Sequence, residues 1–283
     1  MKNSKVTIPD IQRAKDSGRK ITMLTAYDYP FAQLVDLAGV DMILVGDSLG
    51  MVVLGLEGTV AVTMEDMIHH IKAAVRGCQR ALIVGDMPFM SYNTSIKDAI
   101  VNAGRLIKEG GCEAVKLEGG TQFAPTVNAI VNAGIPVQGH IGLTPQTASS
   151  LGGFKTQGKD LAGATQLIND AKSLESAGAF SIILEAVPAP VGELIAEVLK
   201  IPVIGIGAGP KVDGQVLVTH DLLGLFDKFV PKFVKKYAQI REIILEALTE
   251  YKQDVVEGNF PAPENCFNMS PELVSSLRDS LGK

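Results

Sequence analysis

The sequence contains no tryptophan and only three cysteines among its 283 residues. Cys78, Cys112 and Cys266 are odd in number, lie far apart and form no CxxC pair, which argues against a disulfide framework and against a structural zinc site. We interpret them as reduced thiols that act as small apolar side chains. A chain of this length can bury a large hydrophobic core without such cross-links.

Long hydrophobic runs and clusters of positive charge are also missing. Residues 1–20 are polar and lack the apolar core of a signal peptide, and apolar runs elsewhere fall far below the roughly 18 residues that a membrane span requires. The net charge is -5, with acidic and basic residues interspersed, so nothing indicates a nucleic-acid or anionic-membrane partner. We therefore expect a soluble, cytoplasmic protein that acts on small molecules.

Short β-branched runs alternate with longer segments of helical periodicity along most of the chain. Strands are expected near residues 21–26, 42–46, 81–84, 114–117, 136–139, 180–184, 203–206 and 215–218. Helical periodicity covers residues 64–78, 95–109, 123–133 and 161–177. This alternation predicts an α/β fold, a closed parallel (β/α)8 TIM barrel. An open doubly wound sheet is the alternative, but no GxGxxG motif follows the first strand.

Helical segments are expected at both ends of this barrel. Thr7 is a suitable N-cap for a short N-terminal helix that would cover one barrel end. Residues 231–258 predict a long final helix with an apolar stripe, and residues 259–283 form a C-terminal tail richer in Pro, Ser and Asn. A small amphipathic helix near residues 273–281 could dock on a neighbouring subunit, or the tail could simply be docked or frayed. We assign residues 1–283 to a single domain.

Polar side chains stand where most of the predicted strands end. The apolar run at residues 42–45 is followed by Asp47 and Ser48. The later strands end on further ionisable residues, which are Asp86, Lys116, Glu118, His140 and Glu185. Functional residues of a (β/α)8 barrel lie where strands meet the following loops, so these side chains are expected in one site. The strand at residues 203–206 instead runs into the glycine-rich segment 205–209, whose backbone could cradle a phosphate, a carboxylate or a cofactor edge.

Asp47, Asp86 and Glu118 are expected on adjacent strands, which lie about 4.8 Å apart. Their like charges would repel, and a hard divalent cation would relieve that repulsion. Mg²⁺ suits such a site because it takes one or two carboxylates together with waters and substrate oxygens. The alternative is that each carboxylate caps a helix or pairs with Lys or Arg. Lys116 shares a strand face with Glu118, and it could act in the site or be only the ion-pair partner of Glu118.

Glu185 is expected across the barrel mouth from Asp47. It follows an apolar strand and precedes another apolar stretch, surroundings that suit a general base. His140 could bind and polarise a substrate oxygen, or it could orient Glu185. The alternatives are structural, with Glu185 satisfied by the backbone or by His140 at the edge of the core, and with His140 as an isolated structural histidine.

Several short motifs occur in a fixed order along the chain. They are MLTAYDY at residues 23–29, VGDSLG at 45–50, GDMPF at 85–89, KLEGG at 116–120, GHIGLTPQ at 139–146, GGFKTQG at 152–158, GIGAG at 205–209 and DGQVLV at 213–218. Together they make the chain resemble the ketopantoate hydroxymethyltransferase family over about residues 6–260. The ordered set is far more specific than any one motif.

This resemblance implies a barrel enzyme that transfers a hydroxymethyl group from 5,10-methylenetetrahydrofolate to 3-methyl-2-oxobutanoate, giving 2-dehydropantoate in pantothenate biosynthesis. The family's magnesium positions match Asp47, Asp86 and Glu118, its oxo-acid contacts match Asp47, Ser48, Asp86 and Lys116, and its proton acceptor matches Glu185. The resemblance also implies a homo-oligomer, since family members are often decamers.

The implied chemistry suits these residues. A 2-oxo acid can chelate Mg²⁺ through its carboxylate and ketone oxygens, and the cation stabilises the enolate formed when the C3 proton leaves. Glu185 would take that proton, and Lys116 would help to balance charge on oxygen. Asp47 would bind the cation either directly or through a water molecule.

Two other functions are weighed against this one. Lyases and mutases of the phosphoenolpyruvate mutase and isocitrate lyase group are also barrels that bind Mg²⁺ and an oxo acid, but their cysteine-bearing active-site loop is not visible here. A non-catalytic barrel that binds or scaffolds is the second. The presence of Lys116 and Glu185 together with the metal positions argues against it.

Overall fold

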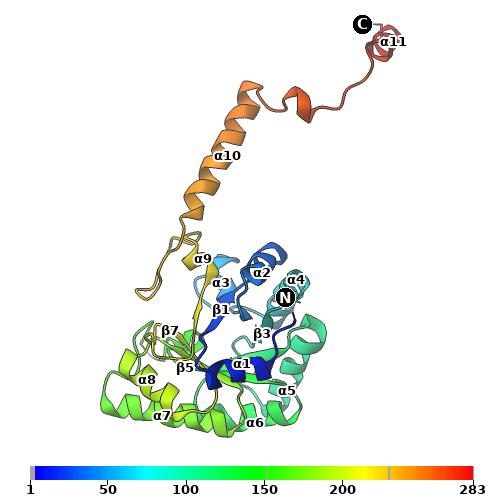
Figure 1. Ribbon diagram of the computed structural model, residues 1–283. Helices are drawn as coiled ribbons and strands as arrows, with labels where there is room; N and C mark the ends of the chain where they lie inside the picture. Colours follow the sequence, from blue (N-terminus) through cyan, green and yellow to red (C-terminus); the bar gives the residue numbers. More distant parts are fainter. Residues whose placement is uncertain (1–3, 151, 229, 283) are drawn as a thin grey trace.

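The computed structural model describes residues 4–150, 152–228 and 230–282. Its centre is a closed barrel of eight parallel strands in chain order (Figure 1). The strands are β1 (Ile21–Thr25), β2 (Met42–Val45), β3 (Leu82–Asp86), β4 (Ala114–Glu118), β5 (Val137–Gly142), β6 (Ser181–Glu185), β7 (Val203–Ile206) and β8 (Gly214–Leu217). β8 pairs with β1, with Met23 opposite Val216. The predicted barrel is confirmed, and the open-sheet alternative is wrong.

Helices cover the outside of the barrel (Figure 1). They are α2 (Tyr29–Leu37), α3 (Leu49–Val52), α4 (Met64–Gly77), α5 (Ile96–Arg105), α6 (Ala124–Asn132), α7 (Leu161–Ser176) and α8 (Ala189–Val198), with short turns η2 (Thr121–Phe123) and η3 (Pro145–Thr147). The helices predicted at residues 64–78, 123–133 and 161–177 correspond to α4, α6 and α7. The segment at residues 95–109 is α5 extended by a π-helical turn, η1 (Leu106–Gly110).

The N-terminal helix α1 (Ile8–Asp16) lies across the N-terminal end of the barrel (Figure 1). Thr7 is its N-cap, and its backbone N–H donates to Asp10 Oδ2 at 2.8 Å. Ile11 and Ala14 are buried and join the apolar cluster that fills the barrel interior. The predicted covering helix is therefore confirmed. The apolar side chains at this end leave the opposite end of the barrel for polar ligands.

The chain after β8 departs from the sequence prediction. α10 (Ile240–Glu257) starts later than expected, so the prediction of a helix from residue 231 is wrong for residues 231–239. The backbone N–H of Tyr237 donates to the carbonyl oxygen of Leu222, which ends the short helix α9 (Thr219–Leu222). This long-range bond, together with the packing of the segment on the barrel mouth, replaces the helical bonds that the local pattern favours.

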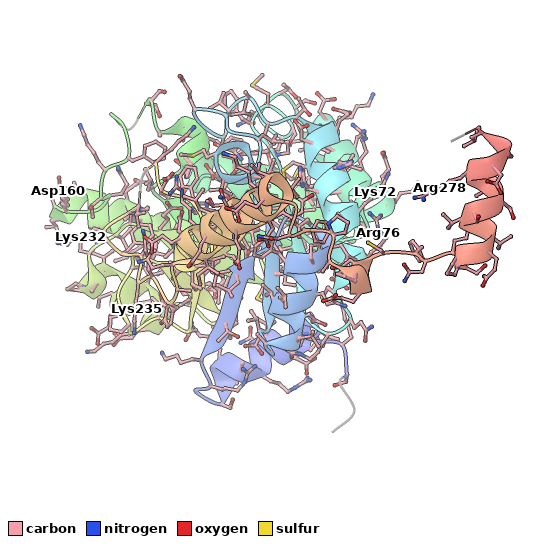
Figure 2. The ribbon with its side chains drawn as sticks, turned by 90° about the horizontal axis from the view of Figure 1, so that it is seen from above. Lys72, Arg76, Asp160, Lys232, Lys235 and Arg278 are labelled. Atoms are coloured by element: carbon pink, nitrogen blue, oxygen red, sulfur yellow. The ribbon has the colours of Figure 1, made fainter. Side chains whose placement is uncertain are left out.

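The last helices, α10 and α11 (Pro271–Ser280), extend away from the barrel, and α11 with Arg278 lies clear of it (Figures 1 and 2). Within the described residues, no side chain of either helix is buried. The helix predicted near residues 273–281 is present as α11. A single domain with a tail from residue 259 stays a prediction. In the part of the chain that is described, no helix is both long and apolar enough to cross a membrane.

Candidate active site

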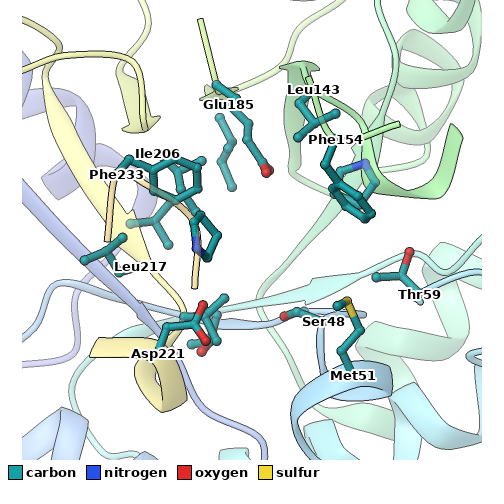
Figure 3. Close-up of a pocket in the computed structure, with 18 of the residues that line it drawn as sticks. Ser48, Met51, Thr59, Leu143, Phe154, Glu185, Ile206, Leu217, Asp221 and Phe233 are labelled. Atoms are coloured by element: carbon teal, nitrogen blue, oxygen red, sulfur yellow. The ribbon is translucent and has the colours of Figure 1, made fainter. Parts of the chain in front are cut away.

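A cavity of about 590 Å³ lies at the C-terminal ends of the barrel strands (Figure 3). Its wall includes all the side chains that the strand ends predicted, which are Asp47, Ser48, Asp86, Lys116, Glu118, His140 and Glu185. Each of them lies in or just after a parallel strand, and such strands present their carboxyl ends at one edge of the barrel. The structure therefore brings the predicted residues together in one place.

Asp86 and Lys116 lie opposite each other in the neighbouring strands β3 and β4. Lys116 Nζ is 2.8 Å from Asp86 Oδ1 and 3.6 Å from Glu118 Oε1. Lys116 thus contacts Glu118, as the ion-pair alternative expected, and lies closer to Asp86, while its role in the site stays a prediction. The other oxygen of Asp86 accepts a hydrogen bond from the backbone N–H of Asp47 at 3.0 Å. This bond joins the end of β2 to the ion pair.

His140 lies between two carboxylates. Its Nδ1 atom is 3.3 Å from Glu118 Oε1, and its Nε2 atom is 3.2 Å from Glu185 Oε2. Lys116 Nζ is also 3.3 Å from His140 Nδ1. His140 thus lies between the ends of β4 and β6, close to both carboxylates. This contact fits both the orienting role and the structural alternative.

Two polar residues that the sequence analysis did not single out complete the network. Gln146 Nε2 donates to Asp47 Oδ2 at 2.9 Å, and its backbone N–H donates to Glu118 Oε2 at 3.1 Å. The Tyr92 hydroxyl donates to Gln146 Oε1 at 2.7 Å and accepts from the Glu118 backbone N–H at 3.2 Å. Gln146 lies in the motif GHIGLTPQ, and this was the one sequence signal that could have indicated a role in the site. Tyr92 lies outside every motif.

Burial and mutual charge shift the pKa values of these groups. Burial, followed by the Asp86 and Glu118 carboxylates, raises the pKa of Asp47 well above its usual value. Burial also raises the pKa of Asp86, although Lys116 opposes the shift. Burial lowers the pKa of Lys116, but the carboxylates around it outweigh burial and raise it. Burial raises the pKa of Glu118, but Lys116 and His140 outweigh it, so the net shift is downward.

His140 adds a second positive charge. Burial and Lys116 lower its pKa, but the Glu118 carboxylate and then Glu185 outweigh them and raise it to about 9. The imidazole is therefore protonated at neutral pH. Lys116 and His140 lie among more carboxylates than their two positive charges can neutralise. The negative charge of Asp47 is the least neutralised, because its side chain accepts a hydrogen bond from the neutral Gln146 amide and its pKa is raised.

This donor set fits a divalent cation that also binds substrate oxygens. Among the described residues, no group of three or more His, Cys, Asp or Glu side chains is arranged to hold a metal ion by itself. Mg²⁺ does not require such a group, because it binds through one or two carboxylates and completes its shell with water and substrate oxygens. A cation beside Asp47 and Asp86 would favour their ionised forms and oppose the burial and the acidic repulsion that raise their pKa values.

Ser48 stands beside this cluster with its hydroxyl 2.8 Å from the hydroxyl of Tyr27. Although Ser48 precedes α3 as its N-cap, its side chain makes no capping hydrogen bond. The hydroxyl is therefore free to contact both Tyr27 and a ligand. Tyr27 is buried and lies in the motif MLTAYDY, but its contact with Ser48 could not be read from the sequence.

The glycine-rich segment at residues 205–209 packs closely against two neighbouring parts of the chain. A Cβ atom at Gly207 would lie 2.5 Å from the Phe233 ring, and one at Gly209 would lie 2.4 Å from Ala189 Cβ. These glycines let the segment 231–239 and α8 approach the backbone closely. A ligand cradle formed by the backbone of residues 205–209 stays a prediction.

Known proteins provide an independent comparison. The family described as ketopantoate hydroxymethyltransferase matches residues 5–263. The chain belongs to this family. The 3-methyl-2-oxobutanoate hydroxymethyltransferase of Heliobacterium modesticaldum is 60% identical over 269 residues, which cover 95% of this chain and 98% of that protein. The protein of the same name from Moorella thermoacetica is 60% identical over 264 residues, covering 93% and 98%.

Membership of the ketopantoate hydroxymethyltransferase family makes the chain an enzyme, a transferase, and confirms the resemblance. Two solved structures of low sequence identity share its fold. A phosphonopyruvate hydrolase has a TM-score of 0.61 at 13% identity, covering 98% of this chain and 96% of that one. For 2,3-dimethylmalate lyase, a member of the PEP mutase/isocitrate lyase superfamily, the TM-score is 0.57 at 13% identity, with 97% and 96% covered. The alternative that this chain is a lyase or mutase of the phosphoenolpyruvate mutase and isocitrate lyase group is thus supported only by the shared fold.

Tyr92→Phe tests the network behind the site. We expect the free energy of unfolding to fall by about 1–3 kcal/mol, because the buried Gln146 side chain and the Glu118 backbone N–H lose a partner. Chemical denaturation measures the change. Tyr237→Phe, at an exposed position of the segment before α10, is the matched control and should stay within about 0.5 kcal/mol of wild type. Equal stability of both variants would contradict the network.

Proposed function

We propose that this chain transfers a hydroxymethyl group from 5,10-methylenetetrahydrofolate to 3-methyl-2-oxobutanoate, forming 2-dehydropantoate in pantothenate biosynthesis. The observation that carries the proposal is one cavity, in a chain of this family, that holds Asp86, Lys116 and Glu185 on separate strand ends. The one-carbon unit forms a bond to C3 of the oxo acid as its two bonds to folate nitrogens break. Water supplies the hydroxyl group and one proton, and the C3 proton completes tetrahydrofolate.

Mg²⁺ is the proposed cofactor, and Asp47, Asp86 and Glu118 would hold it. These carboxylates surround the region of the cavity in which negative charge is least compensated. When bound, the cation would stabilise negative charge on the oxo-acid oxygens. Asp47 and Asp86, at the ends of β2 and β3, would also contact the oxo acid.

Lys116 and His140 would bind the anionic oxygens of the oxo acid. Both are buried and positively charged at neutral pH, so their donors act in a medium where charge is weakly screened. The Ser48 hydroxyl, which is held by Tyr27, adds a neutral donor on the same side. Together they would fix the oxo acid with its C3 atom turned toward Glu185.

Glu185 is the proposed proton acceptor. Its carboxylate points into the cavity from the wall opposite Ser48 (Figure 3). Its side chain is 14% exposed, whereas the side chains of Asp86 and Glu118 are 1% and 2% exposed. A general base needs such access to its substrate. Removal of the C3 proton gives an enolate, whose carbon then attacks the methylene carbon of the folate.

Glu185→Gln should slow exchange of the oxo-acid C3 proton with deuterated water by roughly 10²–10⁴-fold, the usual contribution of a general base. Binding of the oxo acid and of Mg²⁺ should be largely retained, because Gln keeps the size of the side chain. Nuclear magnetic resonance follows the exchange, and calorimetry follows binding. Glu193→Gln, at a partly exposed position of α8, is the matched control. Undiminished exchange would remove Glu185 as the base.

Asp86→Ala should weaken the dependence of exchange on Mg²⁺ and the affinity for the oxo acid together, each by at least about tenfold, or ~1.4 kcal/mol. The reason is that Asp86 is proposed to hold both the cation and, through it, the substrate. Titration of Mg²⁺ and of the oxo acid measures the two effects. Asp16→Ala, at the exposed end of α1, should change neither. Unchanged Mg²⁺ dependence and oxo-acid affinity in Asp86→Ala would contradict the assignment of Asp86 as a metal ligand.

A cytoplasmic location is proposed with this function. Cys78, Cys112 and Cys266 are free thiols, which agrees with a reducing compartment. The proposed partners are the small-molecule substrates and other copies of the chain.

A homo-oligomer, such as the decamer that the family resemblance implies, would explain α10. This helix has 18 residues and buries no side chain among the described residues, whereas most helices in proteins owe their stability to packing of an amphipathic face. It presents an exposed apolar stripe of Ile244, Leu248, Tyr251 and Val255, each about one helical turn from the next. Burial of this stripe against another copy would stabilise the helix.

The double variant Ile244→Glu with Leu248→Glu should lower the oligomer mass measured by light scattering, because it places charge in the proposed contact. The double variant Glu246→Ala with Glu250→Ala, on the opposite face of α10, should leave the mass unchanged. A monomeric wild-type chain, or an unaltered mass in the first variant, would contradict the proposed interface.

A further inference from the structure

One side of the cavity has no role in the chemistry described above. Asp221, in α9, lines the cavity and is 7% exposed. Figure 3 shows its carboxylate at the cavity surface. Its Oδ1 atom is buried and has no hydrogen-bond partner among the described residues. Burial raises the pKa of this carboxyl to about 6, although Lys236 opposes the shift. A buried carboxylate without a donor is costly, so it calls for a ligand that supplies N–H groups.

Asp221 is not needed to hold α9 in place. Its neighbour Thr219 anchors the helix, with its backbone N–H donating to Thr25 Oγ1 at 2.9 Å and its own hydroxyl donating to the Thr25 carbonyl at 2.5 Å. The ring of His220 packs against Tyr27 and Phe31, with centroids 5.4 and 5.2 Å apart. The local structure is therefore satisfied without the Asp221 side chain.

The wall beside Asp221 is apolar and partly aromatic. It includes Leu217, Phe226 and Phe233, and Figure 3 shows Phe233 and Leu217 on the same side of the cavity as Asp221. The Phe233 ring is held directly over Gly207. Aromatic and apolar walls of this kind suit the faces of a flat ring.

This side of the cavity is continuous with the oxo-acid side. Tyr27 packs on His220, next to Asp221, and its hydroxyl lies 2.8 Å from Ser48 Oγ at the proposed substrate site. The volume of about 590 Å³ lies within the roughly 300–1,000 Å³ range of pockets for drug-sized ligands. A small oxo acid would fill only a fraction of it, which leaves room for a second ligand in contact with the first.

We propose that Asp221 binds the 2-amino and N3–H edge of the reduced pterin ring of folate, with Phe233 and Phe226 against the ring. This inference rests on the proposed function, which requires a folate beside the oxo acid. The pterin edge presents two parallel N–H donors, and a carboxylate accepts such a pair in bidentate fashion. The exposed Lys155 and Lys232 at the rim are placed to meet the carboxylates of the glutamyl tail.

Binding of two ligands, tetrahydrofolate and its 2-desamino analogue, tests this assignment by calorimetry without turnover. Wild type should bind tetrahydrofolate at least tenfold more tightly than the analogue, which lacks one donor. Asp221→Asn should lose at least tenfold in affinity for tetrahydrofolate, and the preference over the analogue should disappear. Asp227→Asn, at an exposed position of the same segment, should retain both affinity and preference.

Wild-type protein that binds both ligands equally, or that binds no tetrahydrofolate, would overturn the assignment even if Asp221→Asn does not fold. An equal loss of affinity for both ligands in Asp221→Asn would also overturn it, because that result indicates a structural role. Metal-dependent C3 exchange of the oxo acid in wild type needs no folate. If wild type shows no preference for tetrahydrofolate over the analogue but its C3 exchange is intact, the subsite alone is rejected, whereas absent exchange in wild type rejects the proposed function.

Discussion

The buried negative charge at the mouth of the barrel is the constraint on which the site depends. Burying several carboxylates in one place is unfavourable unless each is paired or hydrogen-bonded. The protein places Lys116 and His140 among them and surrounds them with donors from Gln146 and Tyr92. Asp47 is left with the least compensation. The site therefore favours binding of a positively charged or hydrogen-bond-donating ligand beside Asp47. A cation or the donor groups of a substrate can fill this role.

The register of the barrel arranges this charge. Asp86 pairs with Lys116 across β3 and β4, and Glu118 pairs with His140 across β4 and β5, so an acid faces a base in both pairs. Gly142 pairs with Glu185 across β5 and β6, and a Cβ atom there would lie 2.2 Å from the Glu185 carbonyl oxygen. Its positive φ of 94° also favours glycine. A shift of register would break both acid–base pairs at once.

The barrel and the ionisable residues at the strand ends could be predicted from the sequence because both leave local signals. The barrel appears as an alternation of strand and helix periodicity, and each site residue appears as a polar residue after an apolar run. Gln146 could not be placed from such signals, since its partner Asp47 is 99 residues away. Tyr92 and Tyr27 likewise act through contacts that only the closed barrel creates. Residues 231–239 have a helical pattern but form other bonds, to α9, so tertiary contacts override local preference there.

The two sides of the cavity differ in charge, and this difference would orient the two substrates. An oxo acid carries a carboxylate, which Lys116 and His140 attract and which Asp221 would repel. A neutral pterin ring gains nothing from the cationic side, but it can bury its faces against Phe233 and pair its donors with Asp221. Each ligand is thus disfavoured at the other's position, and repulsion contributes to selectivity as much as attraction does. The acceptor carbon and the one-carbon donor would then meet between Ser48 and Glu185.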